Sequence, residues 1–380
     1  MTRKRVPLGN FVTEYSVRNK NNEDIPVYSV TNSQGFCREY FGKEVASKDK
    51  TTYKIVPYGY FAYNPSRINV GSVDWQRCET QVIVSPLYNV FSVSDELDSQ
   101  FLYYFLKSNI GKQMIRAKAA GSVRDNLKLD MLKEITIPES SLNDQRRCAA
   151  TLDNIQYLIE LRKKQLNELD NLIKARFVEM FGAYPLNPMG WKKGTIRDVV
   201  ADVRYGSSRP AVDGGKYPYL RMNNITYGGE LDLSDVKRID VPENELGKCT
   251  VRRGDVLFNR TNSKELVGKT CVYDRDEMMV LAGFVIRVRV NDLVLPEFLS
   301  AFLNTDFSKR TLLGMCKAAI GQANINAQEM QNIGIYIPPI ELQREFVQFK
   351  NQTDKSKVVV QKALDEAQTL FDSLMQEYFG

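Results

Sequence analysis

Apolar residues recur at alternating steps of four and three over two long stretches of the chain. Such spacing places one apolar stripe along a helix, as in the seam of a coiled coil. It predicts one helix over residues 145–181 and a second that runs to the C-terminus, with Arg162 as the one polar break. The stripe positions are Ile155, Ile159, Leu166, Leu169, Ile173 and Met180 in the first stretch, and Val360, Leu364, Ala367, Phe371, Leu374 and Tyr378 in the second.

The ends of these stretches carry helix signals. Ser141 with Asp144 three residues later forms a capping box, and the pair Pro338-Pro339 marks the second start. Gly182 is a natural stop for the first helix. At ~1.5 Å per residue, a helix over residues 145–181 is ~55 Å long.

The two stretches are copies of one sequence. Gln145 to Gly182 returns as Gln343 to Gly380 at an offset of 198 residues, with no net insertion. A long helix tolerates no insertion, so the repeat agrees with the periodicity. We therefore predict an antiparallel pair of helices that sets the distance between two globular units. The alternative is that each stripe packs only on its own unit.

The segments outside the helices predict mixed α/β units in which strands predominate. In the first unit, β-branched and aromatic runs predict strands over 27–31, 52–56, 59–63 and 88–93, and helices are expected over 101–108 and 112–120. The second unit repeats this order, since Gly59 to Asn64 is echoed by Gly254 to Asn259 and 101–106 by 298–303.

The predicted fold class is therefore α+β, with two tandem β-rich α/β modules that each end in a long helix. The predicted order is a first unit over 1–140, a first helix over 141–182, a second unit over 183–338 and a second helix over 339–380. The copies differ most in their loops, and one scaffold with different loops can present two recognition surfaces.

Composition narrows the classes of function. The chain has 380 residues, a net charge of +6 and no histidine. The charge permits an anionic partner, and the lack of histidine excludes a hydrolase triad and a His-based metal site. Six scattered cysteines without a CxxC pair are typical of reduced thiols in a cytoplasm. The chain has no run of 18 apolar residues and no signal-peptide core, so we expect no membrane span and no export.

Three short motifs resemble enzyme signatures, but each lacks residues that the chemistry needs. Gly268-Lys269-Thr270 ends like a phosphate-binding loop, yet Ser263 stands where its first glycine should be and a strand is expected to follow. Asn64-Pro65-Ser66-Arg67 lacks the aromatic residue of the adenine-methyltransferase loop. Asp235-Val236-Lys237 has no preceding Pro-Asp pair of nuclease type. We therefore expect no catalytic site and no metal or cofactor in this chain.

Polar, basic and aromatic residues interleaved in the loops favour DNA binding instead. Arg and Lys suit phosphates and guanine edges, and Asn can form two hydrogen bonds with adenine. For any single residue the alternative is an ordinary solvated side chain. The set predicted to bind DNA is Arg18, Lys20, Asn21, Lys43, Lys48, Asn64, Arg67, Arg204, Tyr205, Ser207, Arg209, Arg221, Asn223, Asn224, Asn259, Arg260, Asn262 and Lys264. Among them, Asn64, Arg67, Asn259, Arg260 and Lys264 are placed on DNA-facing loops after matched strands.

With these features the chain resembles the DNA-specificity subunits of type I restriction–modification systems. The resemblance rests on two modules, each closed by an Ile-x-Ile-Pro-like segment, a glutamine and a long helix. The second copy reads Ile335-Tyr336-Ile337-Pro338-Pro339-Ile340-Glu341-Leu342-Gln343, and the first, over 137–145, lacks the double proline. Gly254-Asp255-Val256-Leu257-Phe258 before Val267-Gly268 also matches.

The resemblance implies a subunit without catalysis, whose two units are related by a pseudo-twofold axis and lie at opposite ends of the paired helices. Each unit would read one half of a split, asymmetric site in double-stranded DNA. The implied partners are two modification subunits, which bring S-adenosylmethionine and flip the target adenine, and restriction subunits that translocate with ATP and Mg. Two other interpretations stay open on the residues alone: a stand-alone bivalent DNA-binding regulator or restriction decoy, and a structural adaptor that binds no DNA.

Overall fold

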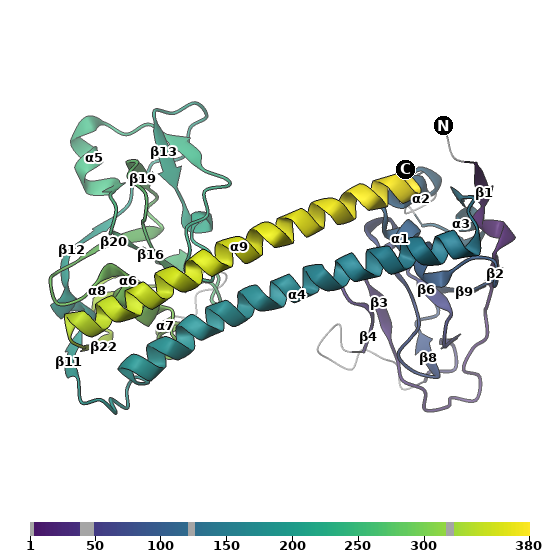
Figure 1. Cartoon of the computed structure of the whole chain (residues 1–380), viewed down its shortest axis with the longest axis horizontal. Helices are drawn as coiled ribbons and strands as arrows, with labels where there is room; N and C mark the ends of the chain where they lie inside the picture. The colour runs from purple at the N-terminus through teal and green to yellow at the C-terminus, as the bar shows by residue number, and fades with distance from the viewer. Residues whose placement is uncertain (1–3, 39–48, 121–125, 317–322) are drawn as a thin grey trace. The chain divides into compact units, whose positions relative to one another are not determined.

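The structure is a computed structural model that describes residues 4–38, 49–120, 126–316 and 323–380. It divides into two compact units. Unit 1 comprises Met1–Lys163 with Lys362–Gly380, and unit 2 comprises Lys164–Gln361. The division falls within both long helices, so each unit contains a part of each helix. The sequence predicted the helices as segments separate from the two units. Figure 1 shows the two helices as uninterrupted ribbons.

Unit 1 begins with short strands and continues through three helices. Its strands are β1 (Arg5–Pro7), β2 (Val12–Glu14), β3 (Ser29–Thr31), β4 (Gly35–Cys37), β5 (Lys54–Pro57), β6 (Phe61–Tyr63), β7 (Val73–Trp75), β8 (Gln81–Val84), β9 (Asn89–Val93) and β10 (Thr136–Pro138). Its helices are α1 (Ser99–Lys107), α2 (Asn109–Ala119) and α3 (Leu129–Lys133), with 3-10 turns η1 (Leu8–Asn10) and η2 (Ile68–Val70). The predicted strands and helices of this unit are confirmed, with ends shifted by a few residues.

The core of unit 1 forms on an antiparallel sheet of order β2-β9-β6-β7. Phe61 on β6 lies opposite Phe91 on β9 and Trp75 on β7, and its ring stacks on Phe91 at 5.0 Å between centroids. Helix α1 packs against β7, and its Phe101 and Phe105 join the same core. This cluster excludes water from one face of the sheet, which is the main stabilising term for such a unit.

Unit 2 has the same order of elements with additional strands. Its strands are β11 (Lys192–Thr195), β12 (Val200–Tyr205), β13 (Tyr217–Leu220), β14 (Lys237–Ile239), β15 (Thr250–Val251), β16 (Val256–Asn259), β17 (Thr261–Asn262), β18 (Thr270–Val272), β19 (Met279–Leu281), β20 (Val285–Val290), β21 (Ala323–Asn324) and β22 (Gly334–Ile337). Its helices are α5 (Glu243–Cys249), α6 (Pro296–Leu303), α7 (Asp306–Met315) and α8 (Ala327–Gln331), with η3 (Ile196–Val199) and η4 (Met222–Asn224).

The two units share one sheet topology. The order β12-β20-β16-β18 in unit 2 corresponds to β2-β9-β6-β7 in unit 1, and all neighbours in both sheets are antiparallel. Phe258 pairs with Thr270 as Tyr63 pairs with Val73, so β16 matches β6 and β18 matches β7. The repeated module predicted from the sequence is confirmed at the level of strand pairing.

The long helices are α4 (Leu142–Phe181) and α9 (Ile340–Phe379), each of 40 residues. Ser141 caps α4 as predicted, because its Oγ accepts from Asp144 N–H at 3.2 Å. The Asp144 carboxylate accepts from the Ser141 hydroxyl at 2.7 Å, which is the serine half of the predicted capping box. Gly182 follows α4 with a φ of +81°, a conformation that favours glycine at a helix end. The apolar stripe is the less exposed face of both helices.

Within each unit the start of one long helix lies against the end of the other. In unit 1, Leu152 of α4 shares the core with Phe379 of α9, whose ring lies 5.0 Å from that of Phe101. In unit 2, Phe181 of α4 lies 5.7 Å from Phe346 of α9. The two helices therefore run antiparallel, as predicted, and their stripes also pack into the globular cores.

Candidate DNA interface

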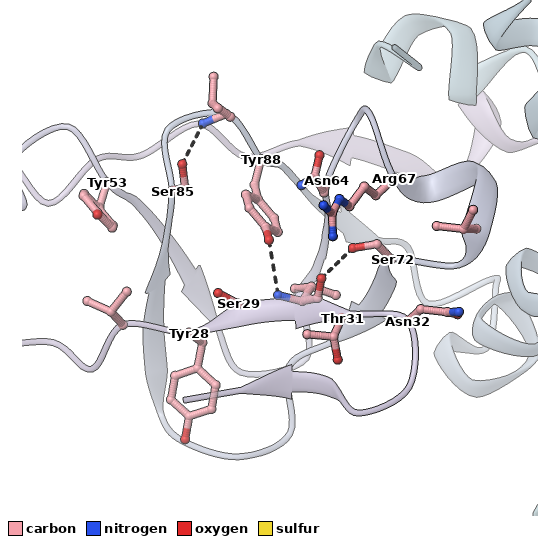
Figure 2. Close-up of a pocket in the computed structure, with 14 residues that line it drawn as sticks. Tyr28, Ser29, Thr31, Asn32, Tyr53, Asn64, Arg67, Ser72, Ser85 and Tyr88 are labelled. Atoms are coloured by element: carbon pink, nitrogen blue, oxygen red, sulfur yellow. Dashed lines mark hydrogen bonds between the residues drawn. The ribbon is translucent and has the colours of Figure 1, made fainter. Parts of the chain in front are cut away.

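A cavity of about 440 Å³ opens on unit 1 next to the loop that carries Asn64 and Arg67. Figure 2 shows both side chains at its wall, together with Tyr88 and strand β3. In the described part of the chain, the lining comes from four separate segments and contains no Asp or Glu. Its residues are Val27, Tyr28, Ser29, Val30, Thr31, Asn32, Tyr53, Asn64, Arg67, Val70, Ser72, Ser85, Leu87 and Tyr88.

The loop between β6 and β7 is held by its own backbone. Asn64 N–H donates to Ser72 O at 3.2 Å, and Ser72 N–H donates to Arg67 O at 3.1 Å. The Asn64 carbonyl accepts from Arg67 N–H, while its side-chain oxygen accepts from Ser66 N–H at 3.1 Å. Ile68 is buried below the loop, and Gly71 closes it with a φ of +101°. The loop is therefore a defined scaffold for the exposed Arg67 guanidinium.

On the edge of β3 that faces the cavity, the backbone groups of Val30 bond side chains and not a neighbouring strand. Val30 N–H donates to Tyr88 Oη at 3.4 Å, and Ser72 Oγ donates to Val30 O. Lys54 Nζ in turn donates to Tyr88 O at 2.7 Å. These bonds fix the position of the Tyr88 ring in the cavity wall.

Several cations of unit 1 are available for an anionic ligand. Arg67, Arg18 and Lys20 are exposed, and within the described part of the chain none has an ion pair with a carboxylate. Asn21 is also exposed, with a weak 3.4 Å hydrogen bond to Glu23. The candidates Lys43 and Lys48 lie outside the described residues.

In unit 2 the loop after β16 carries Arg260, at the position that Pro65 has in unit 1. Its guanidinium lies 5.0 Å from the centre of the Tyr205 ring, and the Tyr205 hydroxyl accepts from Ala327 N–H at 2.9 Å. The Arg260 backbone is fixed by Phe284 O and Ile325 N–H at 3.0 and 2.9 Å. Its Nε is buried and has no hydrogen-bond partner. Arg260 thus lies over an aromatic ring, and its guanidinium keeps N–H donors that are not used in the protein.

The other predicted arginines of unit 2 are held by carboxylates. Arg209 forms two hydrogen bonds with Glu245, at 2.8 and 3.2 Å, and this partner lowers the pKa of the Glu245 carboxyl. Arg204 pairs with Asp202 at 2.8 Å, and Arg221 with Asp235 at 2.8 Å. Exposed pairs of this kind stabilise by only ~0–1 kcal/mol, so a phosphate can compete for these arginines.

Three of the predicted DNA-binding side chains are buried in the structure. The Asn259 side chain is fully buried, donating to Thr261 O and Phe284 O at 3.2 and 3.3 Å. Asn224 donates to Asp232 O at 2.8 Å and accepts from Arg221 N–H. These two amides hold their loops together because they bond backbone groups that would otherwise lack a partner. Both are buried, so they do not reach the surface in this conformation.

Ser207 is the third of these. It is 9% exposed, and its hydroxyl accepts from Arg209 N–H at 3.2 Å. By contrast, Asn223 and Lys264 are exposed, and Asn262 is half-buried with a hydrogen bond to Asn259 at 3.0 Å.

Lys269 does not belong to a phosphate-binding loop. Strand β18 follows it, as expected, and the Lys269 side chain is buried with Nζ donating to Met222 O at 2.9 Å. Burial lowers the pKa of this amine. The described residues also contain no group of three or more Cys, Asp or Glu placed to hold a metal ion, and no described helix is both long and apolar enough to cross a membrane.

Sequence reasoning missed most of the cavity wall. Asn32, Tyr53, Ser72 and Tyr88 were not among the predicted DNA-binding residues, because each comes from a different segment and none has a motif. One difference between the two sequence copies pointed to this wall. The position that is Ser72 in unit 1 is Lys269 in unit 2, so unit 1 has the smaller side chain there.

Comparisons with known proteins agree on one family. The family model described as "Type I restriction modification DNA specificity domain" matches residues 9–171 and 188–366. The specificity subunit of the type I restriction enzyme EcoKI from Escherichia coli is 24% identical over 294 residues, covering 73% of this chain and 63% of that protein. The StySPI specificity subunit from Salmonella potsdam is 22% identical over 74% of this chain and 64% of its own length. The matches thus span less than two thirds of these two relatives.

Solved structures show that the fold is shared. A chain from a structure concerning complex assembly and conformational transition of the type I R-M system has a TM-score of 0.60 at 18% identity, covering 99% of this chain and 97% of that one. The S subunit of a type I restriction–modification system from M. genitalium has a TM-score of 0.54 at 15% identity, covering 100% of this chain and 96% of its own.

Proposed function

Since this chain belongs to the family of type I restriction–modification DNA specificity domains, we propose that it is the DNA-specificity subunit of a type I restriction–modification enzyme. It has no catalytic role of its own. Each of its two units reads one half of a split, asymmetric site in double-stranded DNA. The observation that carries this proposal is the repeated module. In each unit a loop after the same strand presents an arginine, Arg67 in unit 1 and Arg260 in unit 2, that has no carboxylate partner among the residues that the structure describes.

The two arginines support reading of bases as well as binding of phosphates. A guanidinium donates two parallel hydrogen bonds to guanine O6 and N7 in the major groove, and such a pair discriminates by ~1–3 kcal/mol. Arg260 is held over Tyr205, which reduces the entropy that it loses on binding. Exposed Arg18, Lys20, Asn223 and Lys264 suit contacts to the phosphate backbone, which position the protein without reading sequence.

The proposed complex places chemistry in other subunits. Two modification subunits bind S-adenosylmethionine and transfer its methyl group to an adenine flipped out of the duplex. Restriction subunits that use ATP and Mg join the same complex. The complex works in the cytoplasm, where thiols stay reduced. The six cysteines, all within the described residues, form no disulfide bond.

The proposal is tested by co-expression with the modification subunit encoded beside this gene, followed by mapping of methylated adenines in bulk DNA. We expect methylation at one split motif, and none when this chain is omitted. A stable complex that methylates no defined motif would contradict the sequence-reading role. If no complex forms and the purified chain still binds one DNA sequence, a free-standing regulator or decoy becomes the better account.

A further inference from the structure

The cavity of unit 1 is larger than groove reading requires. Base edges in a groove are read by side chains that protrude from a surface. A cavity of about 440 Å³ instead falls within the range of small-ligand sites, ~300–1,000 Å³. The cavity therefore has room for a ligand that enters the protein.

The lining has the chemistry of a site for a planar, anionic molecule. Among the described residues, the Arg67 guanidinium, the Asn64 Nδ2 and the Asn32 side-chain amide have no hydrogen-bond partner, and no carboxylate of those residues lines the cavity. Tyr88 is fixed in the wall by its bonds to Val30 and Lys54. Free donors on one side and aromatic surface on another are how proteins hold a base that has left its stack.

The shared fold does not itself produce this cavity. At the position of Ser72, unit 2 has Lys269, whose chain is buried and reaches Met222 O. At the position of Asn64, unit 2 has Asn259, whose amide is bonded to Thr261 O and Phe284 O. The small serine of unit 1 thus leaves open a space that the lysine chain occupies in unit 2, and the Asn64 Nδ2, unlike that of Asn259, keeps its donors for a ligand.

We propose that the unit 1 cavity binds one nucleotide, with the base against Tyr88 and the Asn64 and Asn32 amides, and the phosphate on Arg67. The nucleotide is either part of the target DNA, extruded from the duplex when unit 1 binds its half-site, or a free mononucleotide. The first source rests on the proposed function, and the second does not.

The DNA source is tested on the complex with its modification subunits and a duplex of the mapped motif. 2-Aminopurine is placed in turn at each position of both half-sites except the methylated adenines. We expect a fluorescence rise on binding at one position in the half read by unit 1, and none in the other half. Two variants close the cavity: Ser72→Lys introduces the residue of unit 2, and Leu87→Glu adds a carboxylate at an exposed lining position. Both abolish the rise, whereas Met278→Glu, at an exposed site of unit 2, leaves it unchanged.

The free source is tested by titrating the four deoxynucleoside monophosphates into the full-length chain. Saturable binding that Leu87→Glu weakens about tenfold or more, without any 2-aminopurine rise, assigns the cavity to a free nucleotide. Specific methylation with neither a rise nor mononucleotide binding overturns the cavity proposal and leaves the proposed function intact. If specific methylation is absent, the proposed function fails, and the mononucleotide titration decides the cavity alone.

Discussion

Arg260 is the residue of unit 2 whose surroundings most favour base reading. Tyr205 lies under its guanidinium, and its backbone is bonded on both sides. We expect Arg260→Ala to weaken DNA binding by the complex by ~1–3 kcal/mol and to relax the preference at one base pair. Fluorescence anisotropy with the mapped site and with single-base variants measures both effects.

The matched control is Arg253→Ala. Arg253 is an exposed arginine of the same unit that forms two hydrogen bonds with Asp276, at 2.7 and 3.0 Å. Its removal should leave affinity and base preference unchanged. Equal losses from the two variants would show that Arg260 contributes only positive charge.

Asn259 illustrates the opposite case, a polar residue with a structural role. Its amide bonds two backbone carbonyls in a site without solvent. Asn259→Ala removes the side-chain donor to Thr261 O and the acceptor of the Asn262 amide, whereas Phe284 O keeps its bond from Arg260 N–H. We therefore expect a loss of ~1–3 kcal/mol in the free energy of unfolding. Urea denaturation measures it, with exposed Asn223→Ala as a control that changes stability by less than ~0.5 kcal/mol. An unchanged urea midpoint for Asn259→Ala would contradict this role.

At the residue scale the sequence predicted polarity but not exposure. Asn64 and Asn259 follow matched strands and look equivalent, yet one lines a cavity and the other is buried. The difference depends in part on the carbonyl of Phe284, which lies 25 residues away in the sequence and is brought to Asn259 by the fold. No local pattern encodes such a contact.

A glutamine near the start of each long helix forms hydrogen bonds with the globular part of its unit. Gln343 accepts from Leu295 N–H at 2.8 Å and donates to Leu293 O and Pro338 O at 3.0 and 2.9 Å. Gln145 makes the same three bonds in unit 1, with Asp98, Glu96 and Ser140. The repeat of glutamine at the helix starts therefore has a physical cause: it bonds the backbone ahead of α6 and α1.

We expect Gln343→Ala to lower the free energy of unfolding by ~1–3 kcal/mol, because three backbone groups lose their partner in a buried place. The comparison is with Gln352→Ala, an exposed glutamine of the same helix, which should have almost no effect. Urea unfolding followed by circular dichroism distinguishes them. Similar midpoints for the two variants would show that the repeated glutamine does not stabilise the helix start.

A second link between elements is ionic. Lys357 of α9 bonds Asp170 of α4 at 2.6 Å and also bonds Glu230, which lies in the loop between η4 and β14. Burial lowers the pKa of Lys357, but the hydrogen bonds that its ammonium donates to the Asp170 and Glu230 carboxylates raise it more, so the net pKa lies above its ordinary 10.5. A lysine whose pKa is higher in the folded than in the unfolded state stabilises the folded state. This stabilisation is fully present at a pH below the pKa of the unfolded state, and it is lost as the pH rises through the pKa of the folded state.

Lys357→Met should therefore destabilise unit 2 by ~1.5–3 kcal/mol at pH 7. The difference from the unchanged protein should stay constant up to about pH 10 and shrink at higher pH, where the native lysine loses its charge. Urea midpoints across this range test the sign, with exposed Lys355→Met as the control. A difference that grows with pH would contradict the ionic link.

At the element scale the sequence predicted the helices better than the strands. Forty residues of one period give a strong signal for α4 and α9. The four strands predicted over 27–93 were located within a few residues, but β4, β7 and β8 were not predicted. The pairing of β1 with β10 was not predicted, since each has three residues and the two lie far apart in the sequence. Short strands depend on distant partners, so local patterns do not specify them.

At the scale of the whole molecule, the main feature is the sequence repeat, which gives two units of the same fold. One sheet order occurs twice, and the same glutamine contacts and closing phenylalanines recur in both units. A protein with two equivalent scaffolds and different loops is suited to read two different half-sites. The repeat was visible in the sequence because the helices allow no insertions, whereas the assignment of single loop residues needed the structure.

The most direct test of this account is a methylation map for three forms of the complex: the unchanged chain, Arg67→Ala and Arg260→Ala. The unchanged chain should methylate one split motif. Each variant should relax base preference in one half of that motif only, and the two variants should affect different halves. Relaxation of the same half by both variants, or a motif that neither variant changes, would contradict the claim that each unit reads its own half-site.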